Sequence, residues 1–134
     1  MIRKDRHAAR APSGKVIPVY TTKGDWPALL VFPFLFNPLG EWIGWVTRQR
    51  EVYDTDGVYV GWITEEPRVL RKRTYDEALP RKAPPSSPAK IRPPATVPLP
   101  PMMAELPFEI VDVLQDEPER LHTTDHGELK EDVD

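Results

Sequence analysis

The sequence predicts an all-β fold: a small antiparallel meander of three to four hairpin repeats with internal pseudo-symmetry, flanked by disordered termini. The main observation is a twelve-residue phrase that recurs at 19–30, 35–46 and 52–63. Each copy has an apolar–aromatic pair, a turn that ends in Gly, an aromatic residue, a small residue and two apolar residues. Repeats about sixteen residues apart are too close for helix pairs and are typical of hairpins.

The turn chemistry supports the same fold. In the second copy Asn37 opens the turn, Pro38 supplies a φ near −65°, and Gly40 stands where a positive φ is needed. A type I turn closed by a glycine bulge is a frequent hairpin connection. The tetrapeptides 21–24 and 54–57 fit this frame, so we expect a hairpin in each copy.

The strands themselves are rich in aromatic and β-branched residues. We expect strands at 16–20, 34–36, 42–47, 52–53, 59–64 and 69–71, with polar links between them. Simple alternation assigns Trp42 and Val46 to one face and Ile43 and Trp45 to the other. The small residues at 28, 44 and 61 share one mid-strand position, which predicts a close approach by the neighbouring aromatic rings.

The domain organisation follows from composition. Residues 1–14 form a basic arm expected to be disordered, and 15–75 form the hairpin repeat domain. Residues 76–105 form a Pro-rich linker that builds no core, because a polyproline-type segment has no hydrophobic face. Residues 106–115 return to apolar character and are expected to dock on the sheet or on a partner, and 116–134 form an acidic disordered tail.

Charge is distributed unevenly along the chain. Residues 105–134 carry eleven acidic and two basic side chains, whereas 1–104 carry sixteen basic and ten acidic ones. An acidic tail on a basic body can screen the body or compete for its partner, although solvation alone also accounts for such runs. The chain has no Cys, no signal peptide is evident, and no stretch approaches the roughly 20 apolar residues of a membrane span. We expect a cytoplasmic protein without membrane contact.

The chain resembles the bacterial four-fold β-flower family, whose small proteins carry phrases like V-Y-x-x-x-G-x-x-V-G-W-I, a Pro-rich stretch with spaced basic residues, and a final apolar segment. The matching pieces are the three copies, residues 81–92 and residues 106–114. A fourth copy is reduced to Val69-Leu70 with no Gly turn after it. The resemblance implies hairpins around a pseudo-four-fold axis and implies no activity. A second resemblance, to PRC-barrel-like domains, rests on 54–63 and also implies a binding module.

Sequence patterns for catalysis and metal binding are weak. The serines lie in segments expected to be flexible, the repeats contain no His, and Glu65-Glu66 has no apolar cover to raise a pKa. We therefore expect no enzyme activity and no cofactor. The segment 54–57 resembles the start of a calcium loop but fits a turn better. His122 and His126 have a zinc-like spacing in a segment without helix signals, so we expect no metal site.

The expected function is that of a protein-interaction or assembly module, with an unidentified protein or a second copy as partner. Its candidate interaction surface consists of aromatic residues that could instead be core, namely Trp26, Trp42, Trp45, Tyr59 and Trp62. Its candidate docking segment consists of apolar residues near the C-terminus, namely Phe108, Ile110, Val111, Val113 and Leu114.

The alternative function is nucleic-acid association, through basic residues and exposed rings. It would use the basic arm, with Arg3, Lys4, Arg6, Arg10 and Lys15. It would also use a second basic cluster, namely Arg68, Arg71, Lys72, Arg73, Arg81 and Lys82. A third and weaker alternative is a small ligand bound by the aromatic residues.

Overall fold

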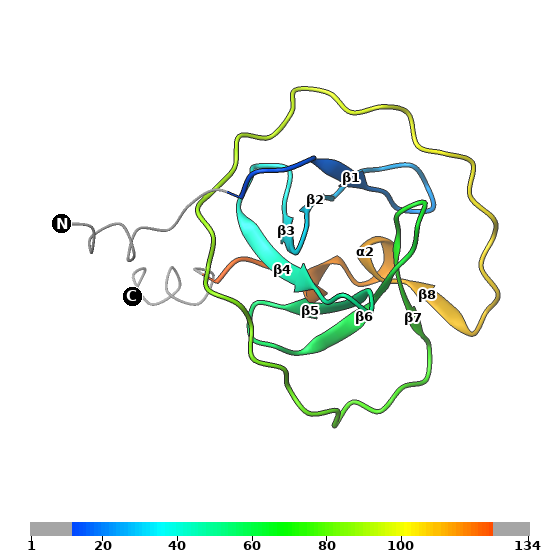
Figure 1. Cartoon of the computed structure of the whole chain (residues 1–134). Coiled ribbons are helices and arrows are strands. Elements are labelled where there is room, and N and C mark those ends of the chain that lie inside the picture. Colours follow the sequence, from blue (N-terminus) through cyan, green and yellow to red (C-terminus); the bar gives the residue numbers. More distant parts are fainter. Residues whose placement is uncertain (1–11, 125–134) are drawn as a thin grey trace, which may run out of the picture.

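A single antiparallel sheet of eight strands follows the order of the chain (Figure 1). The computed structural model describes residues 12–124. The strands are β1 (Ile17–Val19), β2 (Ala28–Val31), β3 (Phe34–Phe36), β4 (Trp42–Val46), β5 (Glu51–Asp54), β6 (Tyr59–Ile63), β7 (Val69–Lys72) and β8 (Ile110–Asp112). The helix α2 (Val113–Asp116) and the 3-10 helix η1 (Pro118–Arg120) follow β8. The predicted all-β hairpin meander is confirmed.

The three predicted turns share one hydrogen-bond pattern. In each, the amide of the closing glycine donates to the carbonyl of the opening residue, over 2.9 to 3.0 Å. The pairs are Gly24 with Thr21, Gly40 with Asn37 and Gly57 with Asp54. All three glycines have a positive φ, between 86° and 101°. The opening side chain completes the turn: Asn37 Oδ1 accepts from the amides of Leu39 and Glu41, for example.

The fourth strand pair is completed by the C-terminal part of the same chain. β7 pairs with β8, and Leu70 lies opposite Asp112. Instead of a tight turn, residues 73–109 connect these two strands. The reduced fourth repeat therefore finds its partner strand almost forty residues further along the chain.

The face assignment from simple alternation is wrong in β4. Trp42 and Trp45 lie in one cluster of buried side chains, and Ile43 and Val46 lie in the other. The cause is a β-bulge: the pairing of β3 with β4 shifts register beside Phe36, which faces Trp42. One extra residue in a strand returns the following side chains to the opposite face. The pairing of β5 with β6 shifts in the same way beside Tyr53.

The small mid-strand residues face backbone rather than aromatic rings. A Cβ atom at Gly44 would lie 2.7 Å from the carbonyl oxygen of Tyr53 and 2.8 Å from Cδ2 of Leu121. A Cβ atom at Gly61 would overlap the carbonyl oxygen of Leu70. Close approach was predicted correctly, but the approaching groups are chiefly the backbones of adjacent strands.

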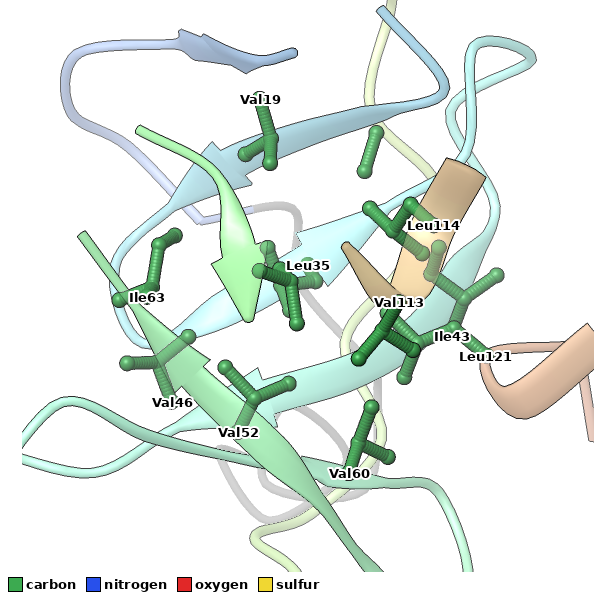
Figure 2. Packing of buried hydrophobic residues seen from close by; sticks show 12 residues of the cluster. Val19, Leu35, Ile43, Val46, Val52, Val60, Ile63, Val113, Leu114 and Leu121 are labelled. Atoms are coloured by element: carbon green, nitrogen blue, oxygen red, sulfur yellow. The ribbon is translucent and has the colours of Figure 1, made fainter. Parts of the chain in front are cut away.

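The inner core lies on the concave side of the sheet (Figure 2). Aliphatic side chains from the repeats meet there, namely Val19, Ala28, Leu35, Ile43, Val46, Val52, Val60, Ile63 and Val69. Val113 and Leu114 from α2 and Leu121 after η1 belong to the same cluster, and Figure 2 shows them together on the side of Ile43. Part of the segment expected to form a disordered acidic tail, residues 116–124, therefore belongs to the folded unit, because Leu121 is a core residue.

A buried polar network joins the first hairpin to β7 and β8. Asp112 accepts hydrogen bonds from the amide and the hydroxyl of Thr22, over 2.7 and 2.6 Å. Arg68 donates to the same hydroxyl over 2.9 Å and forms an ion pair with Glu66 at 2.7 Å. Since Arg68 and Asp112 are both buried, these partners replace the water that each charge would otherwise bind.

The Pro-rich stretch is not a free linker. Residues 76–109, here called the belt, run around the sheet (Figure 1). The amides of Lys82 and Ile91 donate to the carbonyls of Gly57 and Gly40, each over 3.0 Å. The expected disordered arm and the end of the acidic tail lie largely outside the described residues. In the described part of the chain, no helix has the length and apolar character needed to cross a membrane.

Candidate interaction groove

The predicted aromatic surface residues gather on the face of the sheet opposite the inner core. Trp42, Trp45 and Tyr53 are buried in one cluster there, and Trp26 and Tyr59 pack against it. The Trp45 and Tyr53 rings stack with centroids 5.2 Å apart, and Tyr59 meets Tyr53 edge-on at 5.9 Å. The assignment of Trp42 and Trp45 to opposite faces is therefore wrong, because the bulge in the β3–β4 pairing brings both rings to the same face.

Trp62 and Tyr59 line a groove of about 530 Å³ between the sheet and the belt, here called the tyrosine groove. Tyr53, Tyr75 and the belt residue Pro80 also line it. Charged residues on its rim are Glu51, Arg71, Lys72, Arg81 and Lys82. Of the predicted surface residues, only Tyr59 and Trp62 contribute to this groove, and its tyrosines at 53 and 75 were missed.

The phenols of Tyr53 and Tyr59 in the groove stay neutral at ordinary pH. Burial raises the pKa of Tyr53 to about 12, and Glu51 adds to the increase by accepting a hydrogen bond from its hydroxyl over 3.1 Å. Burial and the nearby Glu51 carboxylate also raise the pKa of Tyr59, against the opposing charge of Arg71. Tyr59 can therefore donate to an acceptor on a ligand without ionising, whereas the single O–H of Tyr53 is already donated to Glu51.

One cation of the groove is neutralised within the protein. Arg71 is only 4% exposed and donates from both terminal nitrogens to Glu117, at 2.7 and 3.3 Å. This pairing holds the pKa of Glu117 at about 2, despite the opposing effect of its burial. The guanidinium also lies 4.3 Å from the ring centroid of Tyr75. Arg71 therefore fixes η1 and Tyr75 rather than offering a free charge.

Three other cations remain exposed at the rim, namely Lys72, Arg81 and Lys82. Lys82 Nζ lies 5.7 Å from the ring centroid of Tyr53. With Glu51 as the opposing carboxylate, the rim has an excess of positive charge. The groove thus combines apolar ring surface, the neutral hydroxyl of Tyr59 as a hydrogen-bond donor, and cations.

The predicted second basic cluster does not form one surface. Arg68 and Arg71 are buried and paired with carboxylates. Arg73 donates to the carbonyl of Phe108 over 2.7 Å and lies 4.0 Å from its ring centroid. Of the basic arm, residues up to 11 lie outside the described residues, and Lys15 is exposed.

The candidate docking segment lies partly in the core. Val111, Val113 and Leu114 are buried, Ile110 is half-buried and Phe108 is 74% exposed. The segment packs against its own sheet through β8 and α2. Phe108 lies just before β8 and remains at the surface. Arg73 lies over its ring.

The belt contacts the repeats at a regular spacing that was not noticed in the sequence. Lys82 meets Gly57, Ile91 meets Gly40 and Pro100 meets Gly24, so the contacts are nine residues apart. Nine residues later, the carbonyl of Glu109 accepts from the amide of Arg73 over 2.7 Å. The sequence contains a matching pattern. The residues two positions before the four contacts are Pro80, Ala89, Pro98 and Pro107, so three of the four are prolines.

Residues from two of the weak metal-binding patterns of the sequence, the turn 54–57 and His122, lie close together in the structure. Ligand atoms of Asp54, Asp56 and His122 lie within 4.8 Å of one another. However, Asp54 Oδ1 already accepts from the amides of Asp56 and Val58, which is the hydrogen bonding of a turn. His126 lies outside the described residues. The predicted turn at 54–57 is confirmed.

The fold and the groove define this chain as a small all-β module built from four strand pairs. A sequence model of the family described as 4-fold beta flower protein matches residues 6–106. The chain therefore belongs to the 4-fold beta flower protein family, as the resemblance predicted. Searches among curated proteins and among solved structures gave no match.

Proposed function

We propose that this protein is a non-catalytic protein-interaction module, which holds an extended acidic segment of a partner protein in the tyrosine groove. The observation that carries the proposal is the combination of four aromatic side chains with three exposed cations around one open groove of about 530 Å³. Aromatic rings bury a large apolar area with little loss of side-chain entropy. Exposed cations at the rim favour carboxylates and raise the rate of encounter.

The chemistry of the groove supports binding more than catalysis. The residues that line it include no Ser, His or Cys to act as a nucleophile or a general base near neutral pH. The phenols of Tyr53 and Tyr59 are held neutral, because burial raises the pKa of both, that of Tyr53 to about 12. The carboxylate that lines the groove, Glu51, is already engaged as the acceptor of a hydrogen bond from Tyr53. These features favour binding.

The proposal is tested by affinity capture from native lysate, using the full chain and a charge-reversed variant, Arg81→Glu with Lys82→Glu. Both side chains are exposed, and the belt contact of Lys82 uses its backbone amide, so the variant should fold. The matched control is Arg48→Glu, an exposed residue of the β4–β5 turn. We expect one defined protein with the wild type and the control, and loss of it with the groove variant.

The captured protein should carry an acidic segment, and a synthetic peptide of that segment should compete with it. Binding should persist after nuclease treatment and weaken only moderately in high salt, because contacts with aromatic rings are not screened. Equal capture by the groove variant and the wild type would contradict the proposal. Recovery of a second copy of the chain would instead indicate self-association.

A nucleic-acid function is the second candidate, because Tyr59 and Trp62 lie beside Lys72 and Arg81, a combination that can stack bases and bind phosphates. It predicts material that nuclease destroys and that high salt removes steeply. A mobility-shift assay at low salt with a single-stranded oligonucleotide separates the two candidates. A shift that is lost in the Arg81→Glu, Lys82→Glu variant would favour nucleic acid.

A further inference from the structure

The belt carries four cations that have no carboxylate partner in the described part of the chain. They are Arg81, Lys82, Lys90 and Arg92, here called the basic arc. All four side chains are exposed, and none takes part in the ion pairs found among residues 12–124. No acidic residue occurs between 78 and 104, so the positive charge of the arc is not offset along the belt.

The C-terminal segment leaves the core beside this arc. Leu121 is buried in the inner core, His122 and Thr123 are half-buried, and Thr124 is exposed. Thr123 and Thr124 line a cavity of about 220 Å³ with Ser87, Pro88 and Lys90 of the belt. In Figure 1 the orange end of the described chain likewise reaches the belt. Thr124, the last described residue, therefore lies in the lining of the same cavity as Lys90.

These following residues, 125–134, are complementary to the arc in charge and sufficient in length. They contain one lysine and five acidic residues, namely Asp125, Glu128, Glu131, Asp132 and Asp134. Ten extended residues span roughly 33 Å. The nine residue steps from Lys90 back to Arg81 span about 28 Å as a fully extended polyproline helix. The segment can therefore reach from Lys90 to the rim of the tyrosine groove.

We propose that residues 125–134 bind in cis along the basic arc and compete with an acidic partner segment for the tyrosine groove. The competition rests on the proposed function, whereas the intramolecular contact does not. A tethered segment has an effective concentration in the millimolar range, which favours contact even when each ion pair is weak. Because exposed pairs are weak and screened by salt, the contact is reversible.

The contact is tested by paramagnetic relaxation in the full chain. Lys130→Cys provides a unique attachment site for a nitroxide label, because the chain has no cysteine. We expect the label to broaden the amide signals of Arg81 and Lys82 at low salt. These two residues are decisive, since signals near Lys90 broaden merely because the segment starts there. The effect should disappear in 0.5 M salt, where the screening length is only about 4 Å.

The matched control carries the same label in a chain with a neutral arc: Arg81→Gln, Lys82→Gln, Lys90→Gln and Arg92→Gln. Broadening at residues 81 and 82 should be lost there, while the spread of backbone signals should stay that of the folded chain. Equal broadening at residues 81 and 82 in both chains, or none in either, would overturn the intramolecular contact.

The competition is tested with a fluorescein-labelled ten-residue poly-glutamate peptide, followed by anisotropy at low salt. The full chain is compared with a full-length variant whose five acidic residues from 125 to 134 are changed to amides. We expect the variant to bind the peptide at least about tenfold more tightly, because its tethered competitor has lost its charge. Equal affinities above background would overturn the competition and leave the groove function standing. Absence of binding to both chains, with the relaxation contact present, would overturn the groove function and leave the intramolecular contact standing.

Discussion

Two features of the structure require glycine at position 57. Its φ of 87° lies in the left-handed region that disfavours side chains. In addition, a Cβ atom there would overlap the carbonyl oxygen of Lys82 in the belt. Gly24 has a similar φ of 101°, but a Cβ atom there would lie 3.5 Å from Pro100, which is ordinary contact. The two positions therefore separate backbone strain from belt displacement.

We expect Gly24→Ala to lower the free energy of unfolding by about 1–2 kcal/mol through its φ alone. Gly57→Ala should cost roughly 1–3 kcal/mol more, because the belt must also move. Urea unfolding followed by tryptophan fluorescence measures both. Equal losses would show that the belt does not constrain Gly57.

Tyr53 should make the protein sensitive to alkali. Its folded pKa of about 12 exceeds the ordinary value of 10, so the neutral phenol is favoured in the folded state. The corresponding stability is fully present below pH 10 and is lost as the pH rises through about 12. The total is as much as ~2–3 kcal/mol, at 1.36 kcal/mol per pKa unit.

Absorbance at alkaline pH should show one tyrosine that ionises late, and Tyr53→Phe should remove that step. The variant should also lose less stability than the wild type between pH 10 and pH 12 in urea unfolding. An unchanged late step in Tyr53→Phe would assign the late titration to another tyrosine.

Among the elements, the C-terminal segment contributes β8 to the sheet and α2 to the inner core. Asp112 accepts from the amide of Gln115 over 3.3 Å at the start of α2 and also binds Thr22. Val113 and Leu114 then enter the inner core. Residues 110–116 thus complete the fourth strand pair, cap the helix α2 and contribute two side chains to the inner core.

We expect Leu114→Ala to lower the free energy of unfolding by about 2–4 kcal/mol, because it leaves a cavity among buried aliphatic side chains. Phe108→Ala, in the same segment but largely exposed, should change it by only about 0.5 kcal/mol or less. Thermal and urea unfolding of the two full-length variants measure the contrast. A mild effect of Leu114→Ala would mean that the segment is not docked in solution.

At the scale of the whole molecule, the belt contacts the strand pairs in reverse chain order. It meets the third hairpin at Gly57, the second at Gly40 and the first at Gly24, and it ends beside Arg73 of the fourth pair. The regular spacing of nine residues matches the regular placement of the turns. The belt therefore carries the pseudo-symmetry of the sheet although its own residues form no regular secondary structure.

This arrangement predicts selective protection in amide hydrogen exchange. The amides of Lys82 and Ile91 should exchange slowly, because each donates to a turn carbonyl. The amides of Ser86 and Ser87, which lie between these contacts and are exposed, should exchange rapidly. Two-dimensional NMR of the full chain in deuterated buffer measures all four. Uniformly rapid exchange along the belt would contradict its docking.

Much of the hairpin architecture could be predicted from the sequence, because it depends on local chemistry. Asn37, Asp54 and the following glycines form their turns through bonds within four residues. The face assignment failed because a bulge depends on how two strands pair, as at Phe36 and Trp42. For the candidate site, Tyr59 and Trp62 were found by their repeat positions. Arg81 belongs to a segment expected to be a linker, and Tyr75 stands at the end of the expected repeat domain, outside the repeated phrase.

The all-β class, the turns and the apolar character of the C-terminal segment could be predicted because each depends on residues that are close in the chain, and the family could be predicted from the repeated phrases. The structure was needed to show that β8 pairs with β7, that the belt runs around the sheet (Figure 1) and that Arg68 and Arg71 are buried in ion pairs. The physical reason is distance: Arg71 and Glu117 are 46 residues apart, and a local pattern carries no information on which remote group will neutralise a charge.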